Sequence, residues 1–284
     1  MTEPKPQSNN TQMPLKAKHG HIPGTPILKV SDLTVRYESG NALEQVSFEL
    51  IAGERMAVVG PNGAGKSTLF KIIAGVMRSE TGTVKIFGAE PLGHICIAYL
   101  PQRSQVDWNF PVSVTDVVMM GRTRRMGYLR WPSAVDREIV NNALATVGMQ
   151  SLASRQINQL SGGQQQRMFI ARALAQEAEL MLMDEPFTGL DAPSQDELFT
   201  VLDTLKSKKV TVMVALHDLK LAAERFDRVM LLKHRLVGLG SPNEVFREET
   251  LNQAYGDRIQ VLVHEHQVSV IDDTCCGEEG HSHA

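Results

Sequence analysis

Apolar and polar residues follow two spacings along the chain, and these spacings predict where strands and helices lie. Mixed alternation over residues 27–37 and 42–50 predicts two strands of a half-exposed antiparallel sheet. Short apolar runs predict further strands at 54–59, 83–87, 96–100, 180–183, 210–216 and 228–232. Helical spacing recurs at 66–76, 115–120, 134–147, 164–175 and 193–206. Fully apolar strands that alternate with helices indicate a buried parallel sheet, so the predicted fold class is α/β.

The two ends of the chain differ in composition from the region between them. Residues 1–26 are polar with scattered prolines, which predicts a disordered tail. Residues 264–284 contain acids, histidines and cysteines but no lysine or arginine, and we expect them to be mostly unordered without a ligand. The central region, 27–263, has the density of apolar residues that a folded domain needs.

Composition excludes several classes of protein. The chain has 284 residues, 42% of them apolar, so it can bury a sizeable core. Its net charge of −3 gives no general attraction for nucleic acid or anionic lipid. Three cysteines do not make a disulfide framework, and no apolar run approaches the ~18 residues of a membrane-spanning helix. We therefore expect a soluble, cytoplasmic chain that reaches a membrane only through a partner.

A glycine-rich segment between a predicted strand and a predicted helix has the composition of a phosphate-binding loop. Its residues match the Walker A pattern G-x-x-x-x-G-K-[ST]: Gly60, Pro61, Asn62, Gly63, Ala64, Gly65, Lys66, Ser67 and Thr68. Glycines let backbone N–H groups turn toward phosphate oxygens, and the helix that follows adds its N-terminal dipole. Lys66 would reach the terminal phosphates, and the Ser67 hydroxyl would bind Mg²⁺.

Two acids follow the apolar strand predicted at 180–183. Asp184 is expected at the carboxyl edge of the sheet, where it would hold Mg²⁺. Glu185 is placed one residue further on, where it would orient or deprotonate an attacking water.

A second helix start has the features of an anion-binding site. Its residues, which follow Leu160, are Ser161, Gly162, Gly163 and Gln164. One chain would thus have two helix N-termini that are suited to bind phosphate but a single Walker A loop. A head-to-tail dimer resolves this difference, because each ATP would lie between the Lys66 loop of one subunit and the Ser161 loop of the other.

This set of motifs, in this order, resembles the ATP-binding-cassette (ABC) ATPases, over residues 27–255. The resemblance implies a RecA-like P-loop NTPase core with an antiparallel β-subdomain and an α-helical subdomain at about 103–168. It implies ATP and Mg²⁺ as ligands and an active ATPase. It also gives roles to four more residues: Tyr37 stacks on adenine, Gln102 contacts Mg²⁺ or water, Asp191 contacts the partner subunit, and His217 contacts the γ-phosphate.

A single cassette without a spanning helix would need a separate membrane permease as its partner. The stretch around Trp108 and Phe110 suits a docking surface for this permease. The amino-acid sequence of 106–122 resembles that of the ATPase subunits of bacterial manganese, zinc and iron importers. The resemblance implies that the chain is peripheral at the cytoplasmic face of the membrane and works indirectly with an extracytoplasmic metal-binding protein. Manganese is the first cargo it indicates, and zinc the second.

Two other functions are weighed against metal import. ATPases of iron–siderophore or cobalamin importers look much alike. A soluble ABC ATPase that acts on nucleic acid or ribosomes belongs to another class, and it is disfavoured because the chain has one cassette and no basic patch.

The C-terminal segment supplies separate metal chemistry. Imidazole and thiol groups lie among its carboxylates, at His264, His266, Cys275, Cys276, His281 and His283. Such ligands suit Zn²⁺, Cu or Ni²⁺ better than Mn²⁺. The segment could be a regulatory sensor, a weak metal buffer or a polar tail without function, and it need not bind the transported ion.

Overall fold

A computed structural model describes residues 26–38, 40–90, 96–102, 104, 106–127, 131–256, 259–264 and 267–272, with the backbone alone from 259 onward. The tail predicted to be disordered, residues 1–26, lies outside the described residues except for Pro26, as do the cysteines and histidines from 273 onward. Among the helices that are described, none is long and apolar enough to cross a bilayer.

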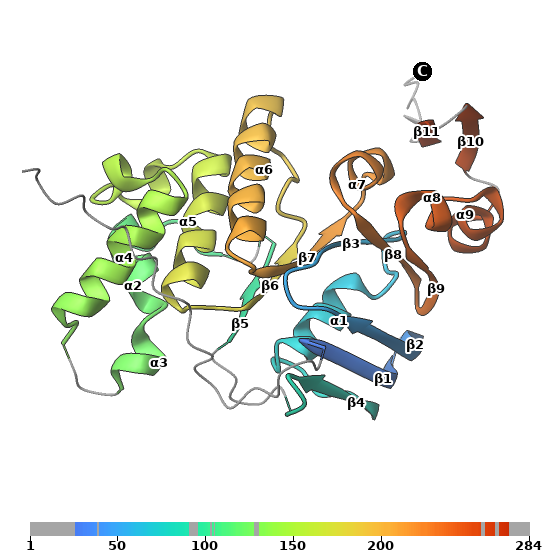
Figure 1. Cartoon of the computed structure of the whole chain (residues 1–284), viewed down its shortest axis with the longest axis horizontal. Coiled ribbons are helices and arrows are strands. Elements are labelled where there is room, and N and C mark those ends of the chain that lie inside the picture. Colours follow the sequence, from blue (N-terminus) through green and yellow to red (C-terminus); the bar gives the residue numbers. More distant parts are fainter. Residues whose placement is uncertain are drawn as a thin grey trace, which may run out of the picture.

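A six-stranded sheet forms the centre of the molecule (Figure 1). In spatial order its strands are β5 (Ile97–Leu100), β6 (Leu180–Asp184), β7 (Thr211–Leu216), β3 (Arg55–Val59), β8 (Arg228–Lys233) and β9 (Arg235–Gly240). The first five run parallel and β9 is antiparallel to β8. The predicted parallel sheet is confirmed, and its central strands β6 and β7 are buried at every position because both faces are covered.

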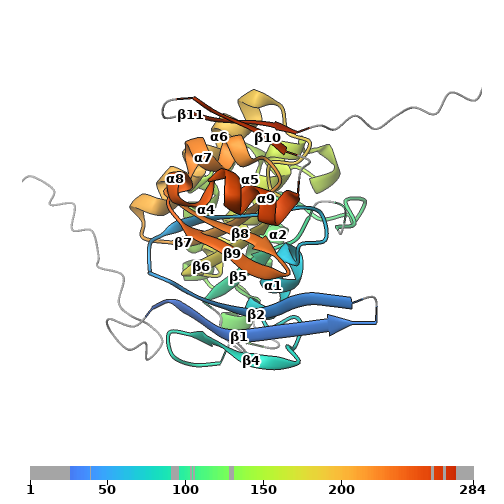
Figure 2. The ribbon, with the colours of Figure 1, turned by 90° about the vertical axis from the view of Figure 1, so that its right-hand side faces the viewer.

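A separate antiparallel sheet lies beside the central one (Figure 2). It consists of β2 (Gly40–Leu50), β1 (Leu28–Tyr37) and β4 (Thr81–Ile86), with β1 in the middle. Helix α1 (Lys66–Ile73) presents Leu69, Phe70 and Ile73 to one apolar cluster that contains residues of both sheets. This packing fixes the start of α1 against the end of β3.

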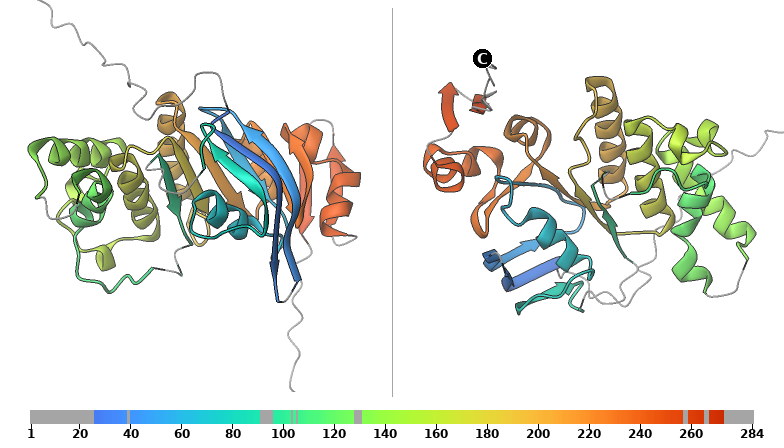
Figure 3. Two further views of the ribbon diagram at one scale, coloured as in Figure 1. Left: turned by 90° about the horizontal axis from the view of Figure 1, so that it is seen from below. Right: turned by 180° about the vertical axis from the view of Figure 1, so that it is seen from behind.

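Helices cover the other face of the central sheet (Figure 3). They are α5 (Gly162–Ala175), α6 (Ala192–Ser207), α7 (Leu219–Arg225), α8 (Pro242–Val245) and α9 (Glu248–Tyr255). The other described helices are α2 (Val114–Met120), α3 (Thr123–Met126) and α4 (Ala134–Thr146), with short 3₁₀ turns at Gln150–Leu152 and Ile157–Gln159. Helices α2, α4 and α5 pack on one another and form a lobe at one end of the molecule. The second apolar cluster joins this lobe to the alternate residues of the strands, such as Ala57 and Val59 of β3.

One predicted boundary needs correction, and several elements go beyond the sequence predictions. The helix predicted over 66–76 ends at Ile73, because Gly75 adopts a φ of 70° that stops the helical path, and Val76 is exposed. Strand β9 and helices α7 to α9 were not predicted. Of the segment 264–284, which is expected to be mostly unordered, only His264 and residues 267–272 are described; there β10 (Ile259–His264) and β11 (Gln267–Asp272) form an antiparallel pair. The alternation in Val268, Ser269 and Val270 is the local pattern that allows this strand.

Candidate nucleotide-binding site

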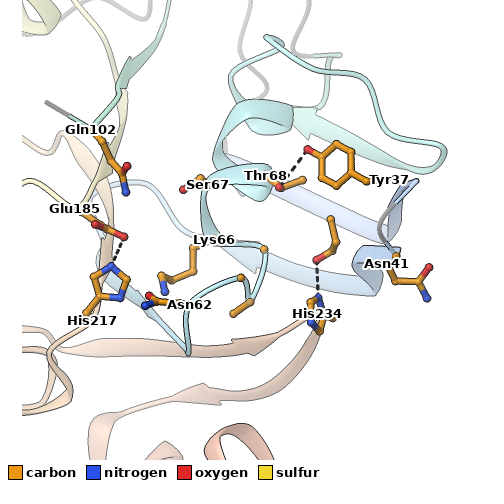
Figure 4. A pocket seen from close by; sticks show the side chains of 15 residues that line it. Tyr37, Asn41, Asn62, Lys66, Ser67, Thr68, Gln102, Glu185, His217 and His234 are labelled. Carbon is orange, nitrogen blue, oxygen red and sulfur yellow. Dashed lines mark hydrogen bonds and ion pairs between the residues drawn. The ribbon is translucent and has the colours of Figure 1, made fainter. Parts of the chain in front are cut away.

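A cavity of about 510 Å³ opens at the carboxyl ends of β3, β6 and β7 (Figure 4). This is the edge at which parallel α/β sheets bind their ligands. The residues that line the cavity are Tyr37, Gly40, Asn41, Ala42, Asn62, Gly63, Ala64, Gly65, Lys66, Ser67, Thr68, Gln102, Glu185, His217 and His234. The structure therefore brings the Walker A loop together with Tyr37, Gln102, Glu185 and His217, which lie far apart in the sequence.

The glycine-rich loop turns sharply between β3 and α1. Gly65 has a φ of 98°, and a Cβ atom there would lie 2.4 Å from the carbonyl oxygen of Ala42. A side chain would therefore clash with strand β2, and glycine is required at this position. The N-terminus of α1 is left open toward the cavity, as an anion-binding loop needs.

Lys66 is the buried cation of the site. Its Nζ atom donates hydrogen bonds to the carbonyl oxygens of Gly60, at 2.6 Å, and Pro61, at 3.2 Å. Burial lowers the pKa of the Lys66 ammonium, and the nearby Glu185 and Asp184 carboxylates offset part of that fall. The ammonium is thus held at the mouth of the loop, where polyanion charge would be neutralised.

Asp184 ends β6 and is fully buried beneath the cavity. Burial raises the pKa of its carboxyl group, and the hydroxyls of Ser67 and Tyr99 offset part of the rise. Tyr99 donates to its Oδ2 atom over 3.2 Å. The Oδ1 atom is buried without a hydrogen-bond partner among the described residues. A buried carboxylate oxygen beside a hydroxyl fits a Mg²⁺ site, whose ligands are oxygens and waters.

Glu185 and His217 face each other across the ends of β6 and β7. The Oε1 atom of Glu185 is in contact with Nε2 of His217 (Figure 4). Glu185 has a φ of 52°, which is rare for a residue with a side chain and which turns the chain out of the strand. Its backbone N–H donates to the carbonyl oxygen of Ala215, so β7 holds the turn in place.

Tyr37 and Gln102 stand at opposite parts of the cavity wall. The Tyr37 hydroxyl lies 3.4 Å from Oγ1 of Thr68 and donates to the sulfur of Met77 at 3.2 Å. Its ring is about half exposed. Gln102 follows β5 and Pro101, and its side chain points toward the cavity.

Four lining residues were not predicted from the sequence, namely Gly40, Asn41, Ala42 and His234. His234 forms the tight turn between β8 and β9 with a φ of 57°; its backbone N–H donates to Ala64 and its ring Nδ1 lies 3.3 Å from the Ala42 oxygen. Asn41 lies at the start of β2. The Gly40–Asn41 turn so close to Tyr37 is a signal that could have indicated Asn41. Nothing local in the sequence points to His234, because long-range strand pairing brings it to the loop.

The Ser161 segment and Asp191 lie elsewhere. Among the described lining residues of the cavity, none comes from 161–164 or is Asp191. Ser161 caps α5, and the Gln164 side chain accepts a hydrogen bond from the Ser161 backbone at 3.0 Å. Asp191 caps α6 by accepting from the backbone N–H of Ser194. Hydrogen bonds from the Ser194 side chain and then from its backbone lower the pKa of the Asp191 carboxyl. Both helix starts are therefore well formed but separated from the cavity of the same chain.

The side chains that would bind metal in the C-terminal tail lie outside the described part of the chain. The side chains of His264 and His266, and residues Cys275, Cys276, His281 and His283, lie outside what the structure describes. Within the described part of the chain, no group of three or more histidines, cysteines or acids could hold a metal ion.

The fold and the loop define a P-loop nucleoside triphosphatase. Residues 43–188 match the family model described as ABC transporter, and the chain belongs to this family of ATP-binding ATPases. It is 44% identical to the manganese transport system ATP-binding protein MntB of Bacillus subtilis, over 83% of this chain and 94% of that one. It is 45% identical to the zinc transport system ATP-binding protein TroB of Treponema pallidum, over 82% and 88% of the two chains. A solved chain described as part of a metal-chelate type ABC transporter in an inward-facing conformation aligns with a TM-score of 0.74 at 29% identity, covering 87% of this chain and 96% of that one.

Proposed function

We propose that this chain is the ATP-hydrolysing subunit of an importer for a divalent transition metal, with manganese as the first candidate cargo and zinc as the second. The observation that carries the proposal is the 44–45% identity to the ATP-binding proteins of a manganese and a zinc transport system, over more than four fifths of the chain. The arrangement of Lys66, Glu185 and His217 around one cavity supports hydrolysis as the source of energy.

In this proposal each group of cavity residues has its own role in binding or hydrolysing ATP. The loop from Gly60 to Thr68 binds the phosphates through its backbone N–H groups and Lys66. Ser67, Gln102 and Asp184 would hold Mg²⁺, which neutralises phosphate charge when it is bound. Glu185 accepts a proton from the attacking water, and His217 contacts the γ-phosphate. Tyr37 stacks on the adenine ring.

The second half of each site comes from a second copy of the chain. Ser161, Gly162, Gly163 and Gln164 lie at a helix start that is remote from the cavity of their own chain, and so does Asp191. A head-to-tail dimer would bring these residues to the phosphates held by the partner's loop. Closure on ATP and opening after hydrolysis would then supply the motion.

Closure and opening of the dimer can drive transport only if the dimer is bound to a membrane protein. We infer an integral permease that docks near the segment of Trp108 and Phe110, and an extracytoplasmic metal-binding protein that acts indirectly through the permease. Phe110 supports a docking role because its ring is largely exposed. Trp108 instead packs edge-on against Phe169 of α5, which would anchor the docking surface to the lobe. The chain would thus be peripheral at the cytoplasmic face of the membrane.

The experiment that tests the proposal is the cellular content of Mn, Zn and Fe in a deletion strain grown under metal limitation. One arm restores the native chain and another restores Glu185→Gln. A selective fall in one metal, reversed by the native chain alone, would name the cargo and connect it to hydrolysis. No change in any of the three metals would overturn metal-ion import and favour a chelated cargo, the activity that the likeness to the metal-chelate transporter supports.

A further inference from the structure

Tyr99 connects the edge strand of the central sheet to the buried carboxylate of the site. It lies on β5, which pairs in parallel with β6 so that Tyr99 is level with Leu182. From there its hydroxyl reaches the end of β6 and donates to Oδ2 of Asp184 at 3.2 Å. Its ring packs against the apolar cluster that contains α1, so the hydroxyl is presented from a fixed position.

This hydrogen bond distinguishes the two oxygens of the Asp184 carboxylate. Oδ2 has the Tyr99 hydroxyl as its partner, whereas Oδ1 is buried with no partner in the described part of the chain. A carboxylate at a strand end can rotate about its terminal torsion, which is broad and two-fold. The Tyr99 donor on Oδ2 and the Ser67 hydroxyl beside the carboxylate restrict that torsion. The buried Oδ1 atom, which has no partner among the described residues, remains available to a cation or its bound water.

Tyr99 is also close in the chain to a residue of the cavity wall. Leu100 and Pro101 separate it from Gln102, and Pro101 restricts the backbone of this short link. Leu100 is buried and pairs with Met183, directly before Asp184. Gln102 of the cavity wall and the hydroxyl that bonds to Asp184 are therefore held on one short segment of the chain.

We propose that Tyr99 is a positioning residue for the Mg²⁺ site, which orients Asp184 through its hydroxyl so that Oδ1 faces the cation. The inference rests on the proposed ATPase function and adds a residue that is not among those lining the cavity. Residues that orient metal ligands from behind commonly change metal affinity 10- to 100-fold when they are removed. Loss of one hydrogen bond from a hydroxyl to a carboxylate falls within the same range.

The test is Tyr99→Phe in the full-length chain, which keeps the ring and removes the hydroxyl. We expect the Mg²⁺ concentration for half-maximal ATP hydrolysis to rise roughly ten-fold, while kcat at saturating Mg²⁺ stays within about three-fold of the native value. ATP binding in EDTA is expected to be unchanged. A second readout needs no turnover: in chains that also have Glu185→Gln, Mn²⁺ binding with ATP, followed by electron paramagnetic resonance, should weaken by the same factor.

The matched control is Tyr255→Phe, which removes a tyrosine hydroxyl on α9, away from the cavity lining. It should leave the Mg²⁺ response native. A native response in Tyr99→Phe would overturn the inference, as would an equal loss of ATP binding with and without Mg²⁺, which would indicate a general structural role. If Tyr99→Phe does not fold, replacement of Tyr99 by 4-aminophenylalanine tests the same point, because its para N–H donor lies where the hydroxyl was and should retain more Mg²⁺ affinity than Tyr99→Leu. A native chain without ATPase activity would instead contradict the proposed function.

Discussion

Glu185 and His217 are in direct contact at the carboxyl ends of neighbouring parallel strands. Glu185 follows β6 and His217 follows β7, and the contact joins Oε1 to Nε2. The Glu185 side chain is mostly buried, whereas His217 is more exposed and closer to solvent. The pair therefore offers a proton acceptor that is held in place by a second group at the cavity wall.

Replacing Glu185 by Gln keeps the shape of the side chain but removes the proton acceptor. We expect ATP affinity to stay within a few-fold of native and kcat to fall roughly 10²- to 10⁴-fold, the usual contribution of a general base. Steady-state hydrolysis and binding of ATP measure the two effects. Because Glu185 and His217 are in contact, we expect the double variant Glu185→Gln, His217→Ala to be no slower than the slower single variant by more than a few-fold.

Exposed Glu224→Gln is the control and should hydrolyse ATP normally. Near-normal turnover in Glu185→Gln would remove the residue from the role of base. Losses that multiply in the double variant would show that the two residues act independently.

The contribution of the Lys66 ammonium to ATP binding can be tested by removing its charge. Its ammonium is buried and bonded to two loop carbonyls, so Lys66→Ala removes the one buried cation that the described cavity wall presents. A hydrogen bond to a charged group contributes about 1.5–3 kcal/mol, which corresponds to a loss of roughly 10- to 100-fold in ATP affinity. Equilibrium binding of a fluorescent ATP analogue measures it. Lys220→Ala, on exposed α7, should bind as the native chain does, and equal affinities in the two variants would contradict the assignment.

Two glycines of the loop allow a comparison of how much an added side chain destabilises the fold. Gly63 and Gly65 both have a positive φ, of 80° and 98°, but a Cβ at Gly63 meets nothing within 4 Å whereas one at Gly65 would be 2.4 Å from the Ala42 oxygen. Gly63→Ala should therefore lower the free energy of unfolding by the backbone strain alone, about 1–2 kcal/mol. Gly65→Ala should cost about 1–3 kcal/mol more, because β2 has to shift. Urea unfolding without nucleotide measures both, and equal costs would show that the loop relaxes freely.

Local patterns in the sequence predicted most of the elements that build the site. The apolar run before Asp184 is a strand, and the glycine-rich segment lies between β3 and α1 as expected. These features can be predicted because a buried strand and a glycine-rich loop each have a characteristic pattern within a few residues of sequence. The sequence did not indicate His234 or the Tyr99–Asp184 hydrogen bond, since both depend on which strands become neighbours in the sheet. It also missed β9, whose residues are only partly buried and so lack a strong alternation.

The last prediction concerns the acid stability of the helical lobe. The Asp136 carboxyl accepts hydrogen bonds from the backbone N–H and hydroxyl of Ser133, at 3.0 and 2.6 Å, and from Arg122 Nε at 3.0 Å. The Ser133 hydrogen bonds, followed by those of Arg122, lower the pKa of this carboxyl below its ordinary value. Arg122 itself is buried and also donates to the Ala175 oxygen, so Asp136 joins the start of α4 to the ends of α2 and α5.

A carboxyl whose pKa is lower in the folded state stabilises that state fully above its ordinary pKa of about 3.9. The contribution is lost as the pH falls through the lower folded value, so the native chain should lose stability as the pH drops below about 4. Asp136→Asn should be less stable at pH 7 by about 1–3 kcal/mol, because the charged hydrogen bonds are gone, and should lose less on acidification. Urea unfolding of the native chain and of Asp136→Asn from pH 7 to pH 3 measures how the free energy of unfolding of each depends on pH. The exposed Asp196→Asn should keep the native acid slope, and an unchanged slope in Asp136→Asn would assign the acid sensitivity to other carboxyls.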